Sequence, residues 1–133
     1  MADTVTSQTI QDGGRTAILK FTNESDGTGE ASVKKVDVSA LATDSDGNAC
    51  TAVTISRIYW ACRGMGVDIE FDASTNVLAV PLPADSTGDE YYDLFSGIPN
   101  NAGSGKTGDI DFTTVGHSSG DAYSIILVLT KHF

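Results

Sequence analysis

The feature that most restricts the fold of this chain is a repeated alternation of apolar and polar side chains at every second residue. Between Arg15 and Asn23, for example, Ala17, Leu19 and Phe21 alternate with polar neighbours. This alternation is typical of β-strands with one buried face and one wet face. No segment shows the sustained three-to-four-residue spacing of an amphipathic helix, so we expect a fold that is almost wholly β.

Turn-forming Gly, Asp, Asn and Ser residues separate about eight such segments. The predicted strands cover residues 1–11, 15–23, 33–38, 51–63, 67–71, 77–82, 109–115 and 122–131. Short helical turns are predicted at 39–42 and 90–95, and loops at 85–89 and 98–108. This spacing predicts an all-β, antiparallel β-sandwich of jelly-roll type over residues 15–133. Residues 1–14 are expected to form an exposed N-terminal arm or an edge strand.

The segment from Thr51 to Phe71 contains the single Trp and is predicted to form a central hairpin. Its apolar positions change parity near Arg57, which predicts either a β-bulge there or cover on both faces of the strand. After a turn at residues 63–66, the alternation resumes from Val67 to Phe71.

The strongest strand signal lies near the C-terminus, where Ile125 to Leu129 are all apolar. Odd-numbered residues from Tyr123 to Leu129 are expected on one face, with Ile126 and Val128 on the other. An unbroken apolar run predicts cover on both faces. The same reasoning predicts that the strand at 77–82 is shielded on both sides.

Composition excludes several classes of partner. The 133-residue chain carries 18 acidic and 8 basic residues, a net charge of -10, and the bases are scattered. The sequence therefore contains no cluster of basic residues of the kind that binds nucleic acid. No apolar run approaches the roughly 20 residues of a membrane span, and the first residues are too polar for a signal peptide, so we expect a soluble protein. Cys50 and Cys62 are expected to be free thiols, with Cys62 buried.

The stretch from Gly103 to Thr107 resembles part of a phosphate-binding loop. The required first glycine is replaced by Asn100, and a strand-like segment follows where the motif needs a helix. Nucleotide binding is therefore not predicted.

Asp44, Asp46 and Asn48 place oxygen-bearing side chains at alternate positions, as the start of a calcium loop does. The bidentate acid that an EF-hand needs is replaced by Ile55. A turn is the preferred interpretation, and a structural calcium ion is an open alternative.

His117, Ser118, Ser119 and Asp121 supply the residue types of a catalytic triad within one loop. Triads depend on geometry between separate segments, so a turn is the preferred interpretation. Two His and two distant Cys give no zinc-binding spacing.

Two pairs of acids, Asp68 with Glu70 and Asp109 with Asp111, each share a strand face. They have the residue types of an acid/base pair, but solvated strand faces commonly carry acids at this spacing. We therefore expect these carboxylates to be solvated and predict no catalytic, cofactor-binding or metal-binding residue.

Three tyrosines are candidates for a binding surface. Tyr59 is predicted to face away from Trp60, and Tyr91 and Tyr92 lie beside a loop. Exposed Tyr is typical of protein interfaces and of sugar-binding platforms, while packing against the ends of the core is an equal alternative. Leu94 and Phe95 are expected to plug one end of the core.

Three segments together resemble the small β-rich virion proteins of tailed bacteriophages, especially those from marine hosts. These are IYWACRGMGVDIEFDAS at residues 58–74, DLFSGIPNNAGSGKTGDIDFTT at 93–114 and GDAYSIILVLTKHF at 120–133. The resemblance implies a non-enzymatic capsid decoration or cement protein with a β-sandwich fold. It supplies no functional motif, so no site residue is carried over.

The resemblance also implies the partners and the location. It implies binding to the major capsid protein, assembly as a homo-oligomer (dimer or trimer), synthesis in the host cytoplasm and residence on the capsid surface. No cofactor, nucleic acid or membrane is expected. Two other readings stay open: a carbohydrate-binding or tail-associated β-sandwich module that uses the tyrosines, and a small hydrolase that uses the acid pairs.

Overall fold

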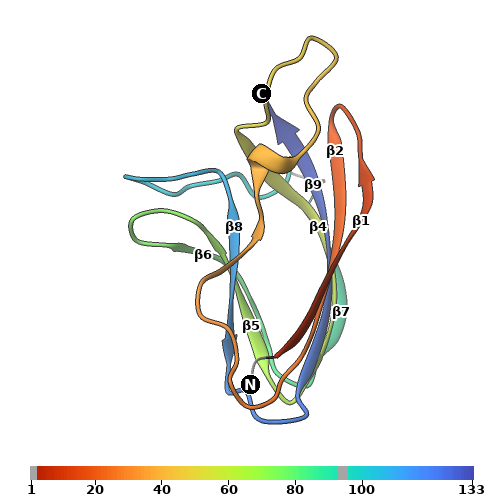
Figure 1. Cartoon of the computed structure of the whole chain (residues 1–133), viewed down its shortest axis with the longest axis vertical. Coiled ribbons are helices and arrows are strands. Elements are labelled where there is room, and N and C mark those ends of the chain that lie inside the picture. Colours follow the sequence, from red (N-terminus) through yellow and green to blue (C-terminus); the bar gives the residue numbers. More distant parts are fainter. Residues whose placement is uncertain (1–2, 93–95) are drawn as a thin grey trace.

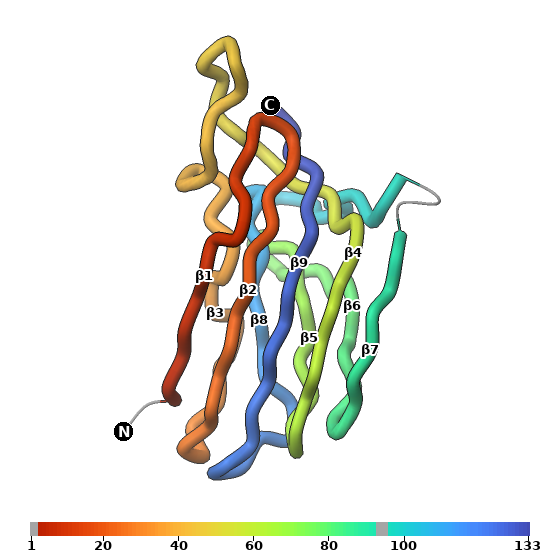
Figure 2. Tube along the Cα trace, turned by 90° about the vertical axis from the view of Figure 1, so that its right-hand side faces the viewer, coloured from red at the N-terminus to blue at the C-terminus, as the bar shows by residue number. Residues whose placement is uncertain are grey.

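The computed structural model describes residues 3–92 and 96–133, and this part of the chain folds as two antiparallel β-sheets packed face to face (Figure 1). The five-stranded sheet faces the viewer in Figure 2, with the four-stranded sheet behind it. The strands are β1 (Thr4–Asp12), β2 (Thr16–Glu24), β3 (Val33–Val36), β4 (Ala52–Arg63), β5 (Gly66–Phe71), β6 (Val77–Leu82), β7 (Thr87–Tyr91), β8 (Ile110–Val115) and β9 (Ala122–His132). A short 3₁₀ helix, η1 (Val38–Ala40), follows β3. The predicted antiparallel β-sandwich is confirmed.

The order of the strands is that of a jelly roll. The five-stranded sheet has the order β1-β2-β9-β4-β7, and the four-stranded sheet has the order β3-β8-β5-β6. Strands therefore pair in nested fashion, β2 with β9, β3 with β8, β4 with β7 and β5 with β6. This is one long antiparallel ribbon wound into two sheets, with β1 added at an edge.

The predicted hairpin from Thr51 to Phe71 is wrong. β4 lies in the five-stranded sheet and β5 in the four-stranded sheet, so the turn between them crosses from one layer to the other. Gly64 turns the chain with a φ of 82°, and the side chain of Met65 is fully buried. Alternation along two successive strands does not reveal whether they pair with each other or face each other across a core.

The change of parity in β4 is a β-bulge, which was one of the two predicted alternatives. Ile55 lies opposite Leu129 and Arg57 lies opposite Val128, which leaves Ser56 as the extra residue. Both Ile55 and Ile58 are fully buried. The bulge thus keeps apolar side chains on the inner face on both sides of the irregularity.

Strand β9 runs through the middle of the five-stranded sheet, between β2 and β4. Ile125, Leu127 and Leu129 are fully buried, and Tyr123 is 3% exposed, as the alternation predicted. The predicted cover on the other face is wrong, because residues at even positions are only half-buried. They lie on the outer face of the sandwich, where no second layer packs within the described chain.

Strand β6 is also less covered than predicted. It forms an edge of the four-stranded sheet, and Leu78 is 51% exposed. Pro81 lies within the strand, which an edge position tolerates because no neighbour needs its missing N–H. The predicted shielding on both faces is therefore wrong.

Strand β7 was missed in the segment predicted as a loop and a helical turn. Its residues, TGDEY, are polar, exposed or half-exposed, and pair with β4 from Arg57 to Ala61. An edge strand with no apolar face has no alternation to detect. The predicted plug formed by Leu94 and Phe95 lies outside the described residues.

Two other predictions are confirmed. Cys50 and Cys62 are both free and buried. The loop at 98–108 contains no strand, although Ile98 forms an isolated bridge with Ile55 and the Thr107 amide donates to the Asp72 carbonyl. Within the described residues, no helix has the length and apolar character that crossing a bilayer requires.

Replacing Leu127 with Ala is expected to lower the free energy of unfolding by about 2–5 kcal/mol, because a large buried side chain leaves a cavity. Ile126→Ala on the outer face is the matched control and should lower it by much less. Urea unfolding monitored by the fluorescence of Trp60 measures both. Equal losses for the two variants would contradict the assignment of faces.

Candidate functional site

The outer face of the five-stranded sheet carries two tyrosines and an arginine in contact. Arg57 and Tyr59 point outward from β4, and Tyr91 lies opposite Arg57 on β7. The two tyrosine rings meet edge to face, with centroids 6.0 Å apart and planes at 69°. The Arg57 guanidinium lies 4.7 Å from the centroid of the Tyr91 ring, within the range of a cation–π interaction. We call these three residues the tyrosine–arginine cluster.

Aliphatic side chains continue this surface across the sheet. On β9, Val128 lies opposite Arg57 and Ile126 lies opposite Tyr59, and on β2 Ile18 lies opposite Val128. Opposite residues of an antiparallel pair point to the same face, so these side chains adjoin the tyrosine–arginine cluster. We call the combined surface the outer-face patch. It consists of Ile18, Arg57, Tyr59, Tyr91, Ile126 and Val128.

The outer-face patch is less acidic than the chain as a whole. Lys20 lies opposite Ile126, and Arg57 is within the patch, so two of the eight basic residues are here. Asp89, opposite Tyr59, is the acid on the β7 side. A chain with a net charge of -10 therefore presents at this face a surface of nearly balanced charge.

The tyrosines predicted as a binding surface divide into two groups. Tyr59 and Tyr91 are brought together on the outer face, and Tyr91 is 47% exposed. Tyr92 is half-buried against the core, and burial raises its pKa. Sequence reasoning overlooked Arg57, although it shares a strand face with Tyr59 at a spacing of two residues.

The geometry of the cluster suits a protein partner better than a sugar ring. A sugar platform needs aromatic faces that are free to stack, but the guanidinium of Arg57 covers one face of Tyr91. The edge-to-face arrangement also gives no shared flat surface. Tyr and Arg beside aliphatic side chains are the composition found at the centre of protein–protein interfaces.

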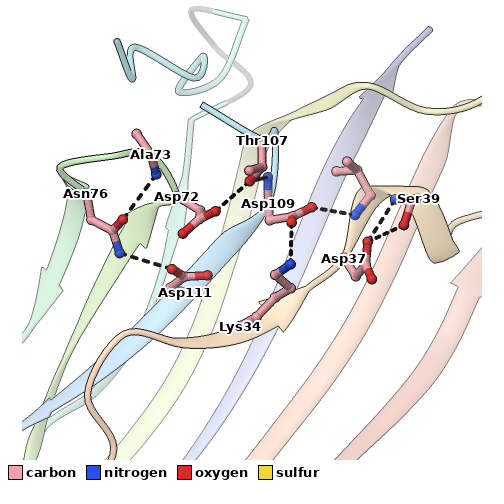
Figure 3. Close-up of polar contacts among 10 residues, drawn as sticks. Lys34, Asp37, Ser39, Asp72, Ala73, Asn76, Thr107, Asp109 and Asp111 are labelled. Carbon is pink, nitrogen blue, oxygen red and sulfur yellow. Dashed lines mark hydrogen bonds and ion pairs between the residues drawn. The ribbon is translucent and has the colours of Figure 1, made fainter. Parts of the chain in front are cut away.

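The pair Asp109 and Asp111 is buried, which corrects the prediction of a solvated strand face. The two residues are 4% and 2% exposed. Asp109 binds the Lys34 ammonium at 3.0 Å and accepts a hydrogen bond from the Val38 amide at 2.9 Å (Figure 3). It thereby ties the start of β8 to β3 and η1.

Asp111 shares its surroundings with a second carboxyl group, that of Asp72 (Figure 3). Asn76 donates a hydrogen bond to Asp111 Oδ2 at 3.0 Å, and Thr107 donates to Asp72 Oδ2 at 2.7 Å. Burial, followed by the neighbouring Asp72, raises the pKa of Asp111 to about 6. The Asp111 and Thr107 side chains lower the pKa of Asp72, so Asp111 is the member of the pair that binds a proton first as the pH falls.

Through these contacts, each carboxyl group connects its own strand to a neighbouring segment. Asp109 holds β3, and the Asp72–Asp111 pair joins the end of β5 to β8 and to the loop at 98–108. The other acid pair is Asp68 and Glu70. Glu70 accepts a hydrogen bond from the Thr113 hydroxyl at 2.8 Å. Burial raises the pKa of Asp68.

The candidate calcium loop is a self-contained turn. Asp44 Oδ1 accepts hydrogen bonds from the amides of Asp46 and Asn48, and its Oδ2 accepts one from the Asn48 side chain. These hydrogen bonds lower the pKa of Asp44. The described residues contain no group of three or more His, Cys, Asp or Glu side chains that is arranged to hold a metal ion.

The loop with triad residue types is likewise a turn. His117 Nδ1 lies 3.0 Å from the Thr114 hydroxyl, and Asp121 accepts a hydrogen bond from the Ser118 amide at 2.8 Å. The loop at 103–107 is followed by β8 rather than a helix, which removes the structural context of a phosphate-binding loop.

Comparison with known proteins shows only distant likenesses. No family model matches the chain, and no curated protein matches it. Among solved structures, a carbohydrate-binding module of family 29 is 11% identical, with 96% of this chain and 89% of that chain covered and a TM-score of 0.42. An RmlC-like cupin from Desulfovibrio desulfuricans is 8% identical, with 92% and 80% covered and a TM-score of 0.34.

A cupin superfamily protein from Desulfitobacterium hafniense is 13% identical, with 100% of this chain and 82% of that chain covered and a TM-score of 0.35. Likenesses this weak carry no statement about what the chain binds or does.

Asp111→Asn is expected to stabilise the protein at about pH 8 by about 1–3 kcal/mol, because the amide resembles the protonated carboxyl group and has no proton to lose. The folded-state pKa of Asp111 is about 6, above the usual value of 3.8. The folded protein therefore binds more protons than the unfolded chain between these values. The wild type should lose stability relative to the variant as the pH rises from about 4 through about 6, and the difference should then level off.

Urea unfolding over this pH range measures the difference between the two proteins. Asp37→Asn is the control of opposite sign, because a hydrogen bond from Ser39 lowers the pKa of Asp37, and its stabilising effect disappears as the pH falls. A difference between wild type and Asp111→Asn that stays constant with pH would contradict the assignment of the proton to Asp111.

Proposed function

We propose that this chain is a non-enzymatic structural protein of a bacteriophage virion, a capsid decoration protein whose outer-face patch binds the major capsid protein. The outer-face patch is the observation that carries the proposal. It brings aromatic, aliphatic and guanidinium groups together on one sheet face, where Tyr91 is exposed and the other five side chains are half-buried. The resemblance of residues 58–74, 93–114 and 120–133 to phage virion proteins supplies the identity of the partner.

The patch has the physical properties of a binding hot spot. Arg57, Tyr59 and Tyr91 hold one another in place, so little conformational entropy is lost when a partner covers them. Ile126 and Val128 supply apolar area beside them. Buried Tyr and Arg at the centre of an interface commonly provide most of its binding energy.

Nearly balanced charge at the patch is a second support. The net charge of -10 makes most of the surface repel acidic proteins, whereas Arg57 and Lys20 offset Asp89 at this face. The outer-face patch is thus able to approach a neutral or acidic surface. Many copies bound to a repeating lattice would each need only a modest affinity if neighbouring copies are linked.

A carbohydrate-binding or tail-associated module is the second candidate function. The observation that favours it is the contact of an exposed Tyr91 with a half-buried Tyr59 on one sheet face. Under this alternative, the Arg57 side chain would have to leave the Tyr91 ring before a sugar could stack on that face.

The test is binding of the purified protein to capsids that lack it. The double variant Arg57→Ala/Tyr91→Ala should weaken binding by roughly 10- to 100-fold, since two hot-spot side chains are truncated. Leu78→Ala is the matched control, because Leu78 is a large apolar side chain on the other sheet and its exposure of 51% is similar to the 47% of Tyr91. Its capsid affinity should equal that of the wild type.

Two outcomes would overturn the proposal. One is capsid affinity that the double variant leaves unchanged, or that Leu78→Ala reduces equally. The other is a glycan-array signal that depends on Tyr59 and Tyr91 while capsids show no binding, which would establish the carbohydrate-binding alternative.

A further inference from the structure

The edges of the two sheets differ in how well they are protected against pairing with another strand. The described sandwich has four edge strands, β1 and β7 in one sheet and β3 and β6 in the other. An edge strand presents unpaired N–H and C=O groups and is a template for another strand unless charge, proline, shortness or a bulge prevents pairing.

Three of these edges carry such protection. Strand β7 contains Asp89 and Glu90, and it has only five residues. Strand β6 contains Pro81, and its register with β5 is interrupted between Ile69 and Glu70. Strand β3 has four residues, and its sequence, VKKV, contains two lysines.

Strand β1 has almost none of this protection. It has nine residues, of which the first eight are exposed, and no charge, proline or glycine occurs from Thr4 to Gln11. Its register with β2 is unbroken from Thr4 to Thr9, and the bulge comes after this stretch. Val5 and Ile10 are 48% and 50% exposed. Residues of high β-propensity in such an edge favour pairing with a further strand.

The edge is also fixed in place at both ends. Asp3 accepts hydrogen bonds from the amides of Asp26 and Gly29 and from the Asn23 side chain. At the other end, Lys131 binds Asp12 at 2.7 Å, and only 4% of Lys131 is exposed. Strand β1 is therefore a preorganised template, so a strand that pairs with it would not have to order it first.

The absence of charge from residues 4–11 favours a second copy of this strand as the partner of the β1 edge. Two copies of a chain with a net charge of -10 repel each other over most of their surface. Two copies of residues 4–11 bring no charge into contact, and their Thr, Ser and Gln side chains can form cross-strand hydrogen bonds. We propose that β1 pairs antiparallel with β1 of a second copy, which joins two five-stranded sheets into one continuous sheet.

This contact is isologous, because the same strand is used on both copies and a two-fold axis relates them. It closes on itself and buries both open edges, so it gives a dimer rather than a fibre. The proposal does not depend on the capsid function, since it rests on β1 alone and the outer-face patch lies on the other strands of the sheet.

The experiment is sedimentation equilibrium of the wild-type protein and of Gln8→Lys over a range of concentrations. In the antiparallel pair, the new lysines of the two copies come close together, and like charges across a strand pair are destabilising. We expect the wild type to dimerise and Gln8→Lys to raise the dimer dissociation constant roughly tenfold or more. Thr87→Lys is the matched control on β7, the opposite edge of the same sheet, and should dimerise as the wild type does.

Hydrogen exchange provides a second measurement, because it reports which amides the dimer protects and a change in net charge alone would not protect the amides of β1. Amides of β1 that point away from β2 should be protected in the wild type at high concentration and exchange in dilute protein. Gln8 lies opposite Lys20 on β2, so Gln8→Lys also places like charges across a strand pair within one copy. Dilute Gln8→Lys should therefore unfold at a slightly lower temperature than the wild type, and dimerisation is compared at temperatures where both proteins are folded.

A wild type that stays monomeric at millimolar concentration would overturn the proposal. So would a trimer, equal dimerisation of wild type and Gln8→Lys, or equal weakening by Thr87→Lys. A dimeric protein that does not bind capsids would contradict the capsid proposal and leave the dimer proposal standing. A monomeric protein that binds capsids would contradict the dimer proposal and leave the capsid proposal standing.

Discussion

The structure depends on burial of the inner faces of two β-sheets against each other, with β9 at the centre of one of them. Ile125, Leu127 and Leu129 have no exposed surface. Each such side chain contributes on the order of 1.5–3 kcal/mol when it is removed from water. A shift of β9 by one residue would expose all three, so the register of the neighbouring strands is strongly fixed. The bulge at Ser56 in β4 is one adjustment that keeps the neighbouring apolar residues inward.

The same register determines the binding surface. Once the odd positions of β9 face inward, Ile126 and Val128 must face outward, and Arg57, Tyr59 and Tyr91 follow from the pairing of β4 with β9 and β7. The candidate site is therefore a direct consequence of core packing. Its side chains are attached to a sheet rather than a loop, which makes the surface rigid before any partner arrives.

Buried polar groups add contacts between segments that also meet in the hydrophobic core. Glu30 accepts a hydrogen bond from the Tyr123 hydroxyl at 2.6 Å and pairs with the Lys35 ammonium at 2.5 Å. The Asp72–Asp111 pair joins β5 to β8 in a similar way at another place in the four-stranded sheet. Breaking one partner of such a network leaves a buried polar group unpaired, which is more destabilising than the loss of the contact itself.

Features that depend on neighbouring residues could be predicted from the sequence. They are the period-two alternation that identifies most strands, the inward face of β9, the parity change in β4 and the turns between strands. The sequence did not determine which sheet each strand joins, because jelly-roll partners such as β2 and β9 lie about a hundred residues apart and pairing is a non-local choice. For the same reason β4 and β5 were taken for a hairpin, and β7, with its polar residues, was missed. The burial of Asp109 and Asp111 and the contact of Arg57 with Tyr91 were decided only by tertiary structure, because each requires strands distant in sequence to meet.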